Sequence, residues 1–284
     1  ANALSINFIF EEFFIPESAY LITYNIDKTH YVGAYTSLLN NPDEIIGSEL
    51  VYGDDIIVEY FEPLNVFKQG RLGIGTVTHA YKQLHLFGDF ILNGYDDSGN
   101  CNHDVACPTG SGWADQISSV AMIVVGGNGA CTGALINNTN NDGTPYFLTA
   151  NHCLGTPANW FFRFNWHATN PSCGTTANSG NGTFNQTTFN SVLRASNAGS
   201  DFALVQLNNT VPVAWNPFYA GWDRTGTAPT TTTGIHHPSG DLKKICRDNN
   251  AATQSTFSGA ACWQIGDWDI GVTEPGSSGS PLFD

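Results

Sequence analysis

The sequence predicts an all-β fold. Charged residues make up only 12% of the 284 residues, aromatic residues another 12%, and 30 residues are glycine. Short apolar or alternating runs recur between turns rich in Gly, Asn and Pro, and they show no helical period. This pattern is typical of a rigid, turn-rich β protein and excludes a coiled coil, a helical solenoid or a disordered tail. At roughly 150 residues per domain, the length allows one large domain or two modest ones.

Residues 1–95 are predicted to form a small β-sandwich-like domain. Alternating or β-branched runs at 5–10, 20–24 and 56–60 indicate strands. No cysteine occurs before residue 101, and up to residue 97 the chain carries 14 acidic but only 4 basic residues. This difference in charge and cysteine use from the rest of the chain predicts a domain boundary, with the turn-rich stretch 93–99 as its linker.

Residues 96–284 are predicted to form the second domain. Apolar runs at 120–125, 144–148 and 202–207 indicate strands, again separated by Gly-, Asn- and Pro-rich turns. Many short strands without a helical period favour a β-sandwich or a β-barrel.

The charge and hydropathy pattern limits the partners of the chain. A formal net charge of −15 disfavours nucleic acid, because such binding relies on Lys and Arg neutralising phosphates. No run of about 18 apolar residues is present, so we expect no membrane span. The sequence begins with Ala and no charged-then-apolar leader follows, so we expect any signal peptide to have been removed.

Seven cysteines indicate an oxidising compartment and structural disulfides. No CxxC pair occurs, so the spacing of a zinc ribbon is absent. Because seven is odd, one thiol must be free or its partner must lie outside this sequence. The cysteines are Cys101, Cys107, Cys131, Cys153, Cys173, Cys246 and Cys262.

The stretch Gly276-Ser277-Ser278-Gly279-Ser280-Pro281 has the pattern of a serine nucleophile loop. A serine that attacks an acyl group needs a tight turn, where its Oγ is exposed and two nearby backbone N–H groups converge on the developing oxyanion. The flanking glycines permit the backbone angles of such a turn. Ser278 is then the candidate nucleophile, with the N–H groups of Gly276 and Ser278 as the oxyanion hole. Taken alone, the string could also be an ordinary Gly/Ser loop.

A candidate base and a candidate orienting acid lie elsewhere in the chain. His152 follows an apolar strand, and a histidine has the pKa to take a proton from a serine hydroxyl. Asp201 begins another strand, where it could hold a histidine in the right tautomer. Separately, the histidine could be structural and the aspartate could cap a turn. Together, the order His152, Asp201, Ser278 predicts a catalytic triad.

With these residues in this order, the chain resembles the chymotrypsin-like serine peptidases. It is most similar to the secreted bacterial lysyl endopeptidases, and the resemblance covers about residues 97–284. It implies a double β-barrel in which His152 is the general base, Asp201 orients it and Ser278 is the nucleophile. The segments that carry the resemblance are 101–107 (CNHDVAC), 131–139 (CTGALINNT), 146–153 (YFLTANHC), 220–224 (AGWDR), 235–238 (IHHP) and 271–275 (GVTEP).

The resemblance also implies a disulfide pattern. The family pairs Cys131 with Cys153, and Cys107 with Cys173. We pair Cys246 with Cys262 by elimination. In the family the partner of Cys101 lies downstream of the serine, so Cys101 is expected to be unpaired here.

The chain is expected to be a truncated part of a longer peptidase. It stops at Asp284, and in the family the strands that follow complete the second barrel and carry the acidic residue that binds the substrate lysine. Specificity for Lys at P1 therefore comes from the resemblance alone. Residues 1–95 resemble the β-rich pro-region that precedes such peptidases, with a permanent accessory domain as the alternative. Ser277 replaces the aspartate that drives activation in trypsin relatives, which leaves removal of a pro-segment as the expected activation of a zymogen.

The sequence therefore predicts a secreted, bacterial serine endopeptidase that acts on polypeptides, as a monomer and without a cofactor. Adjacent His236 and His237 point to opposite faces of a strand, so we expect no metal site there. Two alternatives stay open. One is a non-enzymatic β-rich binding or adhesion module on a peptidase-like scaffold, and the other is a serine peptidase with a different P1 preference, such as Glu, Arg or a small residue.

Overall fold

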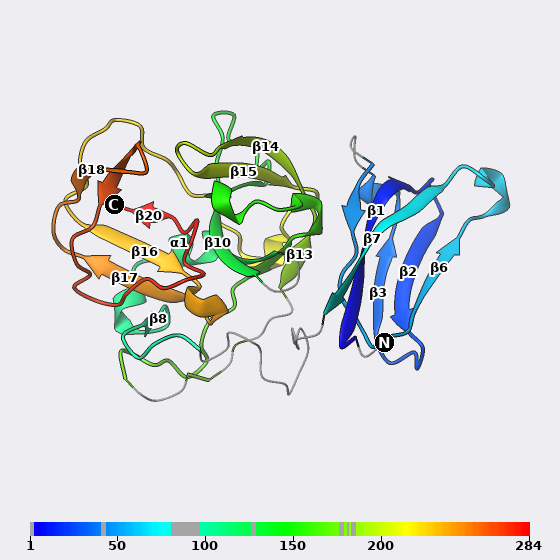
Figure 1. Cartoon of the computed structure of the whole chain (residues 1–284), viewed down its shortest axis with the longest axis horizontal. Coiled ribbons are helices and arrows are strands. Elements are labelled where there is room, and N and C mark those ends of the chain that lie inside the picture. The colour runs from blue at the N-terminus through cyan, green and yellow to red at the C-terminus, as the bar shows by residue number, and fades with distance from the viewer. Residues whose placement is uncertain are drawn as a thin grey trace.

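The computed structural model describes residues 3–40, 44–80, 97–125, 129–175, 179–180, 182 and 186–284. Strands dominate these residues, and they contain one short helix, α1 (Ala114–Ser119). The predicted all-β class is confirmed. Figure 1 shows two groups of strands, the N-terminal group in blue and cyan and the remainder in green to red. Short 3-10 turns connect the strands: η1 (Ser37–Leu39), η2 (Leu64–Val66), η3 (Pro108–Gly110), η4 (Asn151–Cys153), η5 (Pro157–Asn159), η6 (Val213–Trp215) and η7 (Pro238–Gly240).

The N-terminal strands form two antiparallel sheets that share one apolar core. In the first sheet the central strand β1 pairs with three others, and in the second β2 lies between β3 and β6. Phe10, Phe13 and Leu21 are buried in the core between them. The sheets are β1 (Ser5–Phe14), β4 (Ile46–Gly47), β5 (Val51–Tyr52) and β7 (Arg71–Ala80), and β2 (Tyr20–Asn25), β3 (Tyr31–Tyr35) and β6 (Ile56–Phe61).

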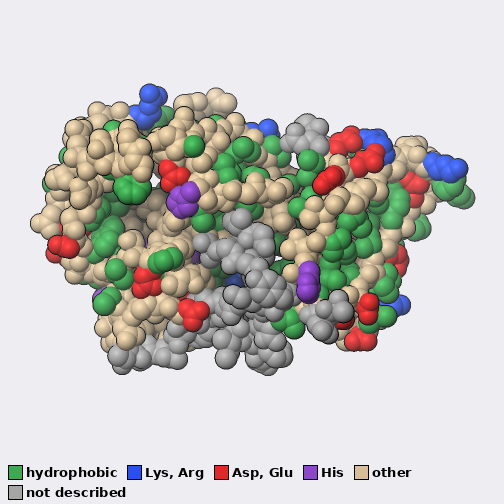
Figure 2. Space-filling view, in the orientation of Figure 1, with side chains coloured by type: hydrophobic (Ala, Val, Ile, Leu, Met, Phe, Trp, Pro, Cys, Tyr) green, Lys and Arg blue, Asp and Glu red, His purple; other side chains and the backbone are tan. Residues whose placement is uncertain are grey.

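The outer surface of these N-terminal strands is partly apolar. Figure 2 shows hydrophobic side chains gathered on the face of this body that is turned to the viewer. Leu38, Leu64 and Phe67 are among the most exposed large hydrophobic residues of the described chain. All three lie in or next to the turns η1 and η2, outside the strands.

A seven-stranded antiparallel sheet follows, and it closes on itself. Its order is β13-β12-β9-β10-β11-β15-β14, so its two edge strands are consecutive in sequence. They meet at Asn190, which has φ of 67° and bonds through its backbone to Trp160 O and to the N–H of Asn208. The strands are β9 (Val120–Val125), β10 (Gly129–Ile136), β11 (Tyr146–Ala150), β12 (Phe161–Phe164), β13 (Thr187–Phe189), β14 (Ser191–Asn197) and β15 (Phe202–Leu207). We call this sheet the first barrel.

The interior of the first barrel is aromatic. Trp160, Phe147 and Phe162 are fully buried, and the two phenylalanine rings meet edge to face at 4.9 Å. At about 25 cal/mol per Å² of apolar area removed from water, such rings supply a large share of the folding free energy.

A second, smaller set of strands lies beside the first barrel. A four-stranded sheet has the order β20-β16-β17-β8, and a separate hairpin joins β18 to β19. Its core of Val105, Ile235 and Ile245 also takes in Val120 and Ala134 from the first barrel, which packs the two parts together. The strands are β8 (His103–Asp104), β16 (Thr232–His236), β17 (Lys244–Asp248), β18 (Thr253–Phe257), β19 (Ala260–Gln264) and β20 (Leu282–Phe283).

The N-terminal sheets contact the first barrel on the side where it closes. The Gly47 N–H donates to Asn190 Oδ1 at 2.6 Å, and Asn7 Nδ2 donates to Asn159 Oδ1 at 2.9 Å. Leu50 packs among buried apolar side chains of the C-terminal strands. Most of the predicted linker at 93–99 lies outside the described residues, and the division at residue 95 stays a prediction.

The structure contains the two disulfides that the resemblance implied, Cys107–Cys173 and Cys131–Cys153. The second bond joins β10 to η4, directly after β11. Its 22-residue separation corresponds to roughly 3 kcal/mol in the chain-entropy model of disulfide stabilisation.

The predicted Cys246–Cys262 disulfide is wrong, because both thiols are free in the structure. Cys246 lies on β17, where its buried Sγ is 3.7 Å from Gly234 O and burial raises its pKa to about 12. Cys262 lies on β19, opposite Ser255 in the separate hairpin. The two residues belong to different sheets, which pairing by elimination could not anticipate. Cys101 is also free, and it is exposed.

Two findings concern membranes and metals in the part of the chain that the structure describes. None of its helices is long and apolar enough to cross a bilayer. Those residues also bring no three His, Cys, Asp or Glu side chains together as a metal site would.

Candidate active site

Strand pairing brings His152 and Asp201 to the same end of the first barrel. His152 lies in η4, directly after β11, and Asp201 directly precedes β15. These strands pair antiparallel with Ala150 opposite Phe202, so the two flanking residues meet. His152 Nδ1 lies 2.7 Å from Asp201 Oδ2, and the His152 backbone N–H donates to Asp201 Oδ1 at 2.8 Å.

The backbone conformation of Asp201 allows this contact. Its φ of 52° lies in the left-handed region, which aspartate tolerates better than most residues. Its carbonyl oxygen accepts the Asn151 N–H at 3.0 Å, so three hydrogen bonds join Asp201 to the turn that carries His152. This arrangement favours a role of Asp201 in orienting His152 over the simple turn cap that the sequence also allowed.

The electrostatics of the pair define the state of the imidazole. Burial acts to raise the pKa of the Asp201 carboxyl, but the hydrogen bonds from His152 outweigh it and hold this pKa below its ordinary value. An ionised carboxylate only accepts hydrogen bonds, so a neutral His152 carries its proton on Nδ1. Nε2 is then free to accept a proton from a nucleophile. Both side chains are about half exposed, at 57% for His152 and 51% for Asp201.

The loop that carries Ser278 is a tight turn with two left-handed glycines. Gly276 has φ of 96° and Gly279 has φ of 80°. A Cβ on Gly276 would come within 2.8 Å of His237 O. Ser277 N–H bonds to Glu274 O and Ser280 N–H bonds to Ser277 O, both at 3.0 Å.

Two amides of this turn are available for an oxyanion. Among the residues that the structure describes, the N–H groups of Gly276 and Ser278 take part in no hydrogen bond, unlike those of Ser277 and Ser280. Ser277 is buried, and Ser278 is half-buried. Ser277 is therefore turned inward, and the roles of Gly276 and Ser278 in an oxyanion hole stay a prediction.

One buried threonine, Thr132 on β10, connects this loop to the histidine turn. Its N–H donates to Ser278 O at 2.8 Å, and its Oγ1 donates to Gly276 O at 2.9 Å. The same Oγ1 accepts the His237 N–H at 3.0 Å, and the Thr132 carbonyl accepts Thr149 Oγ1 at 2.7 Å. The sequence interpretation missed Thr132, although its place directly after Cys131 in the matching segment 131–139 was a usable signal.

The serine loop also touches the histidine turn directly. Cys153 Sγ lies 4.0 Å from Ser278 O, and Cys153 is the residue after His152. A cleft of about 510 Å³ opens beside them, and its lining includes His152, Asp201 and the segment Gly279–Phe283. The structure thus pairs His152 with Asp201 at the cleft, whereas Ser278 directly precedes the lining segment and is joined to this region through its carbonyl oxygen.

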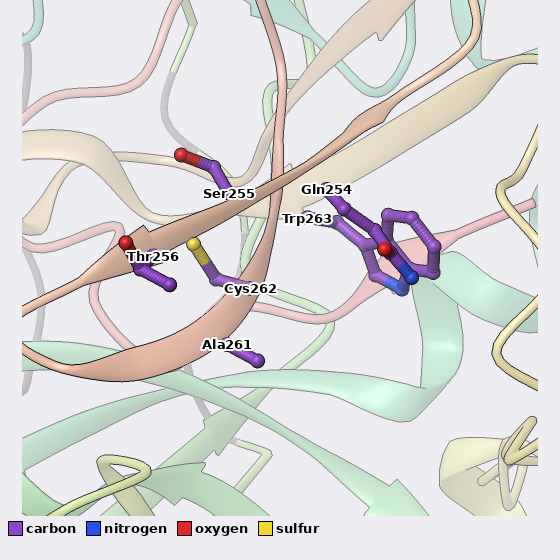
Figure 3. A pocket seen from close by; sticks show the side chains of 6 residues that line it. All are labelled: Gln254, Ser255, Thr256, Ala261, Cys262 and Trp263. Atoms are coloured by element: carbon purple, nitrogen blue, oxygen red, sulfur yellow. The ribbon is translucent and has the colours of Figure 1, made fainter.

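Another pocket of the described residues lies away from this cleft. It measures about 600 Å³ and is formed by the β18–β19 hairpin, with Gln254, Ser255, Thr256, Ala261, Cys262 and Trp263 around it (Figure 3). Its lining includes the free thiol of Cys262 but no histidine or carboxylate that could act as a base beside it, so the larger volume is not an argument for chemistry there.

The two adjacent histidines take separate, buried places. His236 Nδ1 lies 2.8 Å from Ser277 Oγ, whereas His237 Nδ1 lies 2.8 Å from Asp241 O and its ring stacks on Trp166. Both are fully buried, and burial is the main reason that the pKa of each is lowered. They face different partners, Ser277 for His236 and Asp241 for His237.

Replacing Thr132 with Val is expected to destabilise the fold. The variant leaves the part-buried Gly276 O and the buried His237 N–H without a partner, at a cost of about 3 kcal/mol in unfolding free energy. Thr132→Ser keeps the hydroxyl and should lose only about 1 kcal/mol for the missing methyl. Urea denaturation measures both, and equal losses would contradict the role given to the hydroxyl.

Replacing His236 with Asn is expected to reduce the acid sensitivity of folding. Burial, together with the Lys244 ammonium, lowers the pKa of His236 from 6.5 to about 3. The neutral ring thus contributes stability above pH 6.5 that is lost as the pH falls towards 3, because only the unfolded chain takes up the proton. From pH 7 to pH 5 the wild type should lose about 2 kcal/mol relative to His236→Asn. Urea denaturation at the two pH values tests this, and a pH-independent difference would contradict it.

Comparison with known proteins identifies a matching family and a similar curated protein. Residues 95–284 match the family described as lysyl endopeptidase, C-terminal domain. The lysyl endopeptidase of Pseudomonas aeruginosa is 31% identical over 252 residues, which cover 83% of this chain and 53% of that protein. The chain thus spans about half the length of this curated relative.

Two solved protease structures of low identity align with part of this chain. The Rv3671c protease of M. tuberculosis, in an inactive form, aligns with a TM-score of 0.41 at 16% identity, over 64% of this chain and 80% of that one. The thermostable serine protease AL20 from an extremophilic microorganism aligns with a TM-score of 0.38 at 15% identity, over 60% and 79%. On the family match, which extends over well more than half of its residues, this chain belongs to the lysyl endopeptidase C-terminal domain family.

Proposed function

We propose that residues 96–284 are the peptidase domain of a serine endopeptidase. Ser278 Oγ attacks the peptide carbonyl carbon while His152 Nε2 takes the hydroxyl proton. The N–H groups of Gly276 and Ser278 bind the oxyanion, and His152 returns the proton to the leaving amine. Water then hydrolyses the acyl-enzyme by the same route. Asp201 holds the imidazole and stabilises the imidazolium without itself taking up the proton.

The hydrogen-bonded pair of His152 and Asp201 is the observation that carries this proposal. A histidine with Nδ1 on a carboxylate and Nε2 free, at the surface of a cleft, has the arrangement that general-base catalysis needs. The loop with Ser278 supports it, because its backbone contacts Cys153, next to His152. Family membership supports the same reaction class.

We further propose that cleavage follows Lys and that the enzyme is secreted. The preference for Lys rests on the name of the family and of the relative. Secretion is supported by the two disulfides, which persist in oxidising compartments. Residues 1–95 are proposed to be a pro-region, since the family match begins at residue 95 and these strands precede it.

Reaction with a biotinylated diphenyl phosphonate that carries a lysine side chain tests the proposal. Wild-type chain should be labelled at Ser278, and Ser278→Ala should lose the label completely. Asp201→Asn should slow labelling by about a thousandfold or more, because the imidazole then lacks its orienting carboxylate. Peptide mass spectrometry locates the label, and a phosphonate with an alanine side chain should react more slowly.

Ser280→Ala is the matched control, since it changes a serine of the same loop and should keep the label. Labelling of Ser278→Ala at the wild-type rate would place the nucleophile elsewhere. No labelling of the folded wild type, either with residues 1–95 attached or after their removal by limited proteolysis, would favour the non-enzymatic alternative. Faster reaction with the alanine probe would refute the preference for Lys.

A further inference from the structure

Ser277, the neighbour of the nucleophile, points into the protein and has two hydrogen-bond partners. Its side chain is buried, with 8% exposure for the residue. Its Oγ lies 2.8 Å from His236 Nδ1 and accepts the Glu274 N–H at 3.1 Å. The backbone adds the bond from Ser277 N–H to Glu274 O, so the hydroxyl and the amide of one residue close the same turn.

The first partner, His236, is rigid and uncharged. It ends β16 and is fully buried, next to Ile235 in the core of the second set of strands. Within the described part of the chain its Nε2 is buried without a hydrogen-bond partner, so its polar contact is with Ser277. Burial and the Lys244 ammonium both oppose protonation of the ring, and Lys244 itself pairs with Asp104 at 2.6 Å.

The second partner, Glu274, is held from the other side. Its Oε1 accepts the Gly99 N–H at 2.9 Å and Asn102 Nδ2 at 2.8 Å, and its Oε2 accepts Ser239 Oγ at 2.9 Å. Two segments distant in sequence, one with Gly99 and Asn102 and the other with Ser239, therefore meet on this carboxylate. Ser277 is thus placed between two groups that cannot easily move.

From this geometry we propose that Ser277 is a positioning residue, whose hydroxyl, hydrogen-bonded to the buried His236 ring, keeps the amides of Gly276 and Ser278 aimed at the oxyanion. The proposal rests on the proposed peptidase function. In a loop of this kind a displacement of about 1 Å is enough to lower the rate about a hundredfold. Ser277 does not touch the substrate. It acts by positioning the backbone amides of Gly276 and Ser278, the residues on either side of Ser277.

The test measures the rate of phosphonate labelling at Ser278 in the 284-residue chain. Ser277→Ala should lower the second-order rate constant by about ten- to a hundredfold, and His236→Leu should do the same. His236→Asn should restore most of the rate, because an Asn side-chain polar atom can take the place of Nδ1. The double variant Ser277→Ala/His236→Leu should be no slower than either single variant, since both remove one interaction. With peptide substrates, the loss should fall on kcat and leave KM nearly unchanged.

Ser191→Ala is the matched control. Ser191 is as buried as Ser277, at 1% exposure, and its Oγ also donates to a single partner, Pro157 O, but it lies on the far strand β14. It should label at the wild-type rate. Wild-type labelling by both Ser277→Ala and His236→Leu would overturn the proposal, and so would additive losses in the double variant.

Amide hydrogen exchange provides a readout that does not depend on activity. The Glu274 N–H should exchange faster in Ser277→Ala and in His236→Leu than in the wild type, and Ser191→Ala should leave it unchanged, as read from a peptide covering residues 272–278. Unchanged exchange in both loop variants would overturn the proposal even if the chain were inactive. A folded wild type that exchanges as expected but does not label would instead refute the proposed function alone.

Discussion

The arrangement of the cleft depends on one buried residue, Thr132. Nothing covalent links the serine loop to the first barrel near the histidine, so the hydrogen bonds of Thr132 to Gly276 O and Ser278 O set the distance between them. Thr132 is itself fixed, because it is fully buried and Cys131 before it is bonded to Cys153, next to His152. Two adjacent residues of β10 therefore hold the two halves of the site, one by hydrogen bonds and the other by a disulfide.

The side chains of the candidate site and the histidine behind it differ in how deeply they are buried. His152 and Asp201 are half exposed and hydrogen-bonded to each other at the cleft. Behind the loop, His236 is fully buried and its pKa is lowered to about 3, so the same kind of side chain serves there as a neutral hydrogen-bond partner. The two histidines therefore lie in different environments, one half exposed at the cleft and the other fully buried behind the serine loop.

Sequence reasoning reached the parts of this structure that follow from local pattern. The runs at 5–10, 120–125 and 202–207 lie in strands because period-two or apolar patterns fit a pleated, buried surface. His152 and Asp201 could be foreseen because each flanks a recognisable strand. The serine loop was recognisable from its glycines.

Contacts between distant segments were out of reach of such reasoning. The bonds of Thr132, and the contact of Ser277 with His236, depend on how β10, β16 and the serine loop pack, which no local pattern states. The free thiols of Cys246 and Cys262 show the same limit, since spacing along the chain did not reveal that they lie in different sheets.

A crystal structure of the chain after reaction with the lysyl phosphonate tests the central claim most directly. The account predicts a bond from phosphorus to Ser278 Oγ, a phosphonyl oxygen about 3 Å from the amides of Gly276 and Ser278, and His152 Nε2 within hydrogen-bond distance of the adduct. Phosphorus on another residue, or an adduct on Ser278 whose oxygen faces solvent away from both amides and from His152, would contradict it.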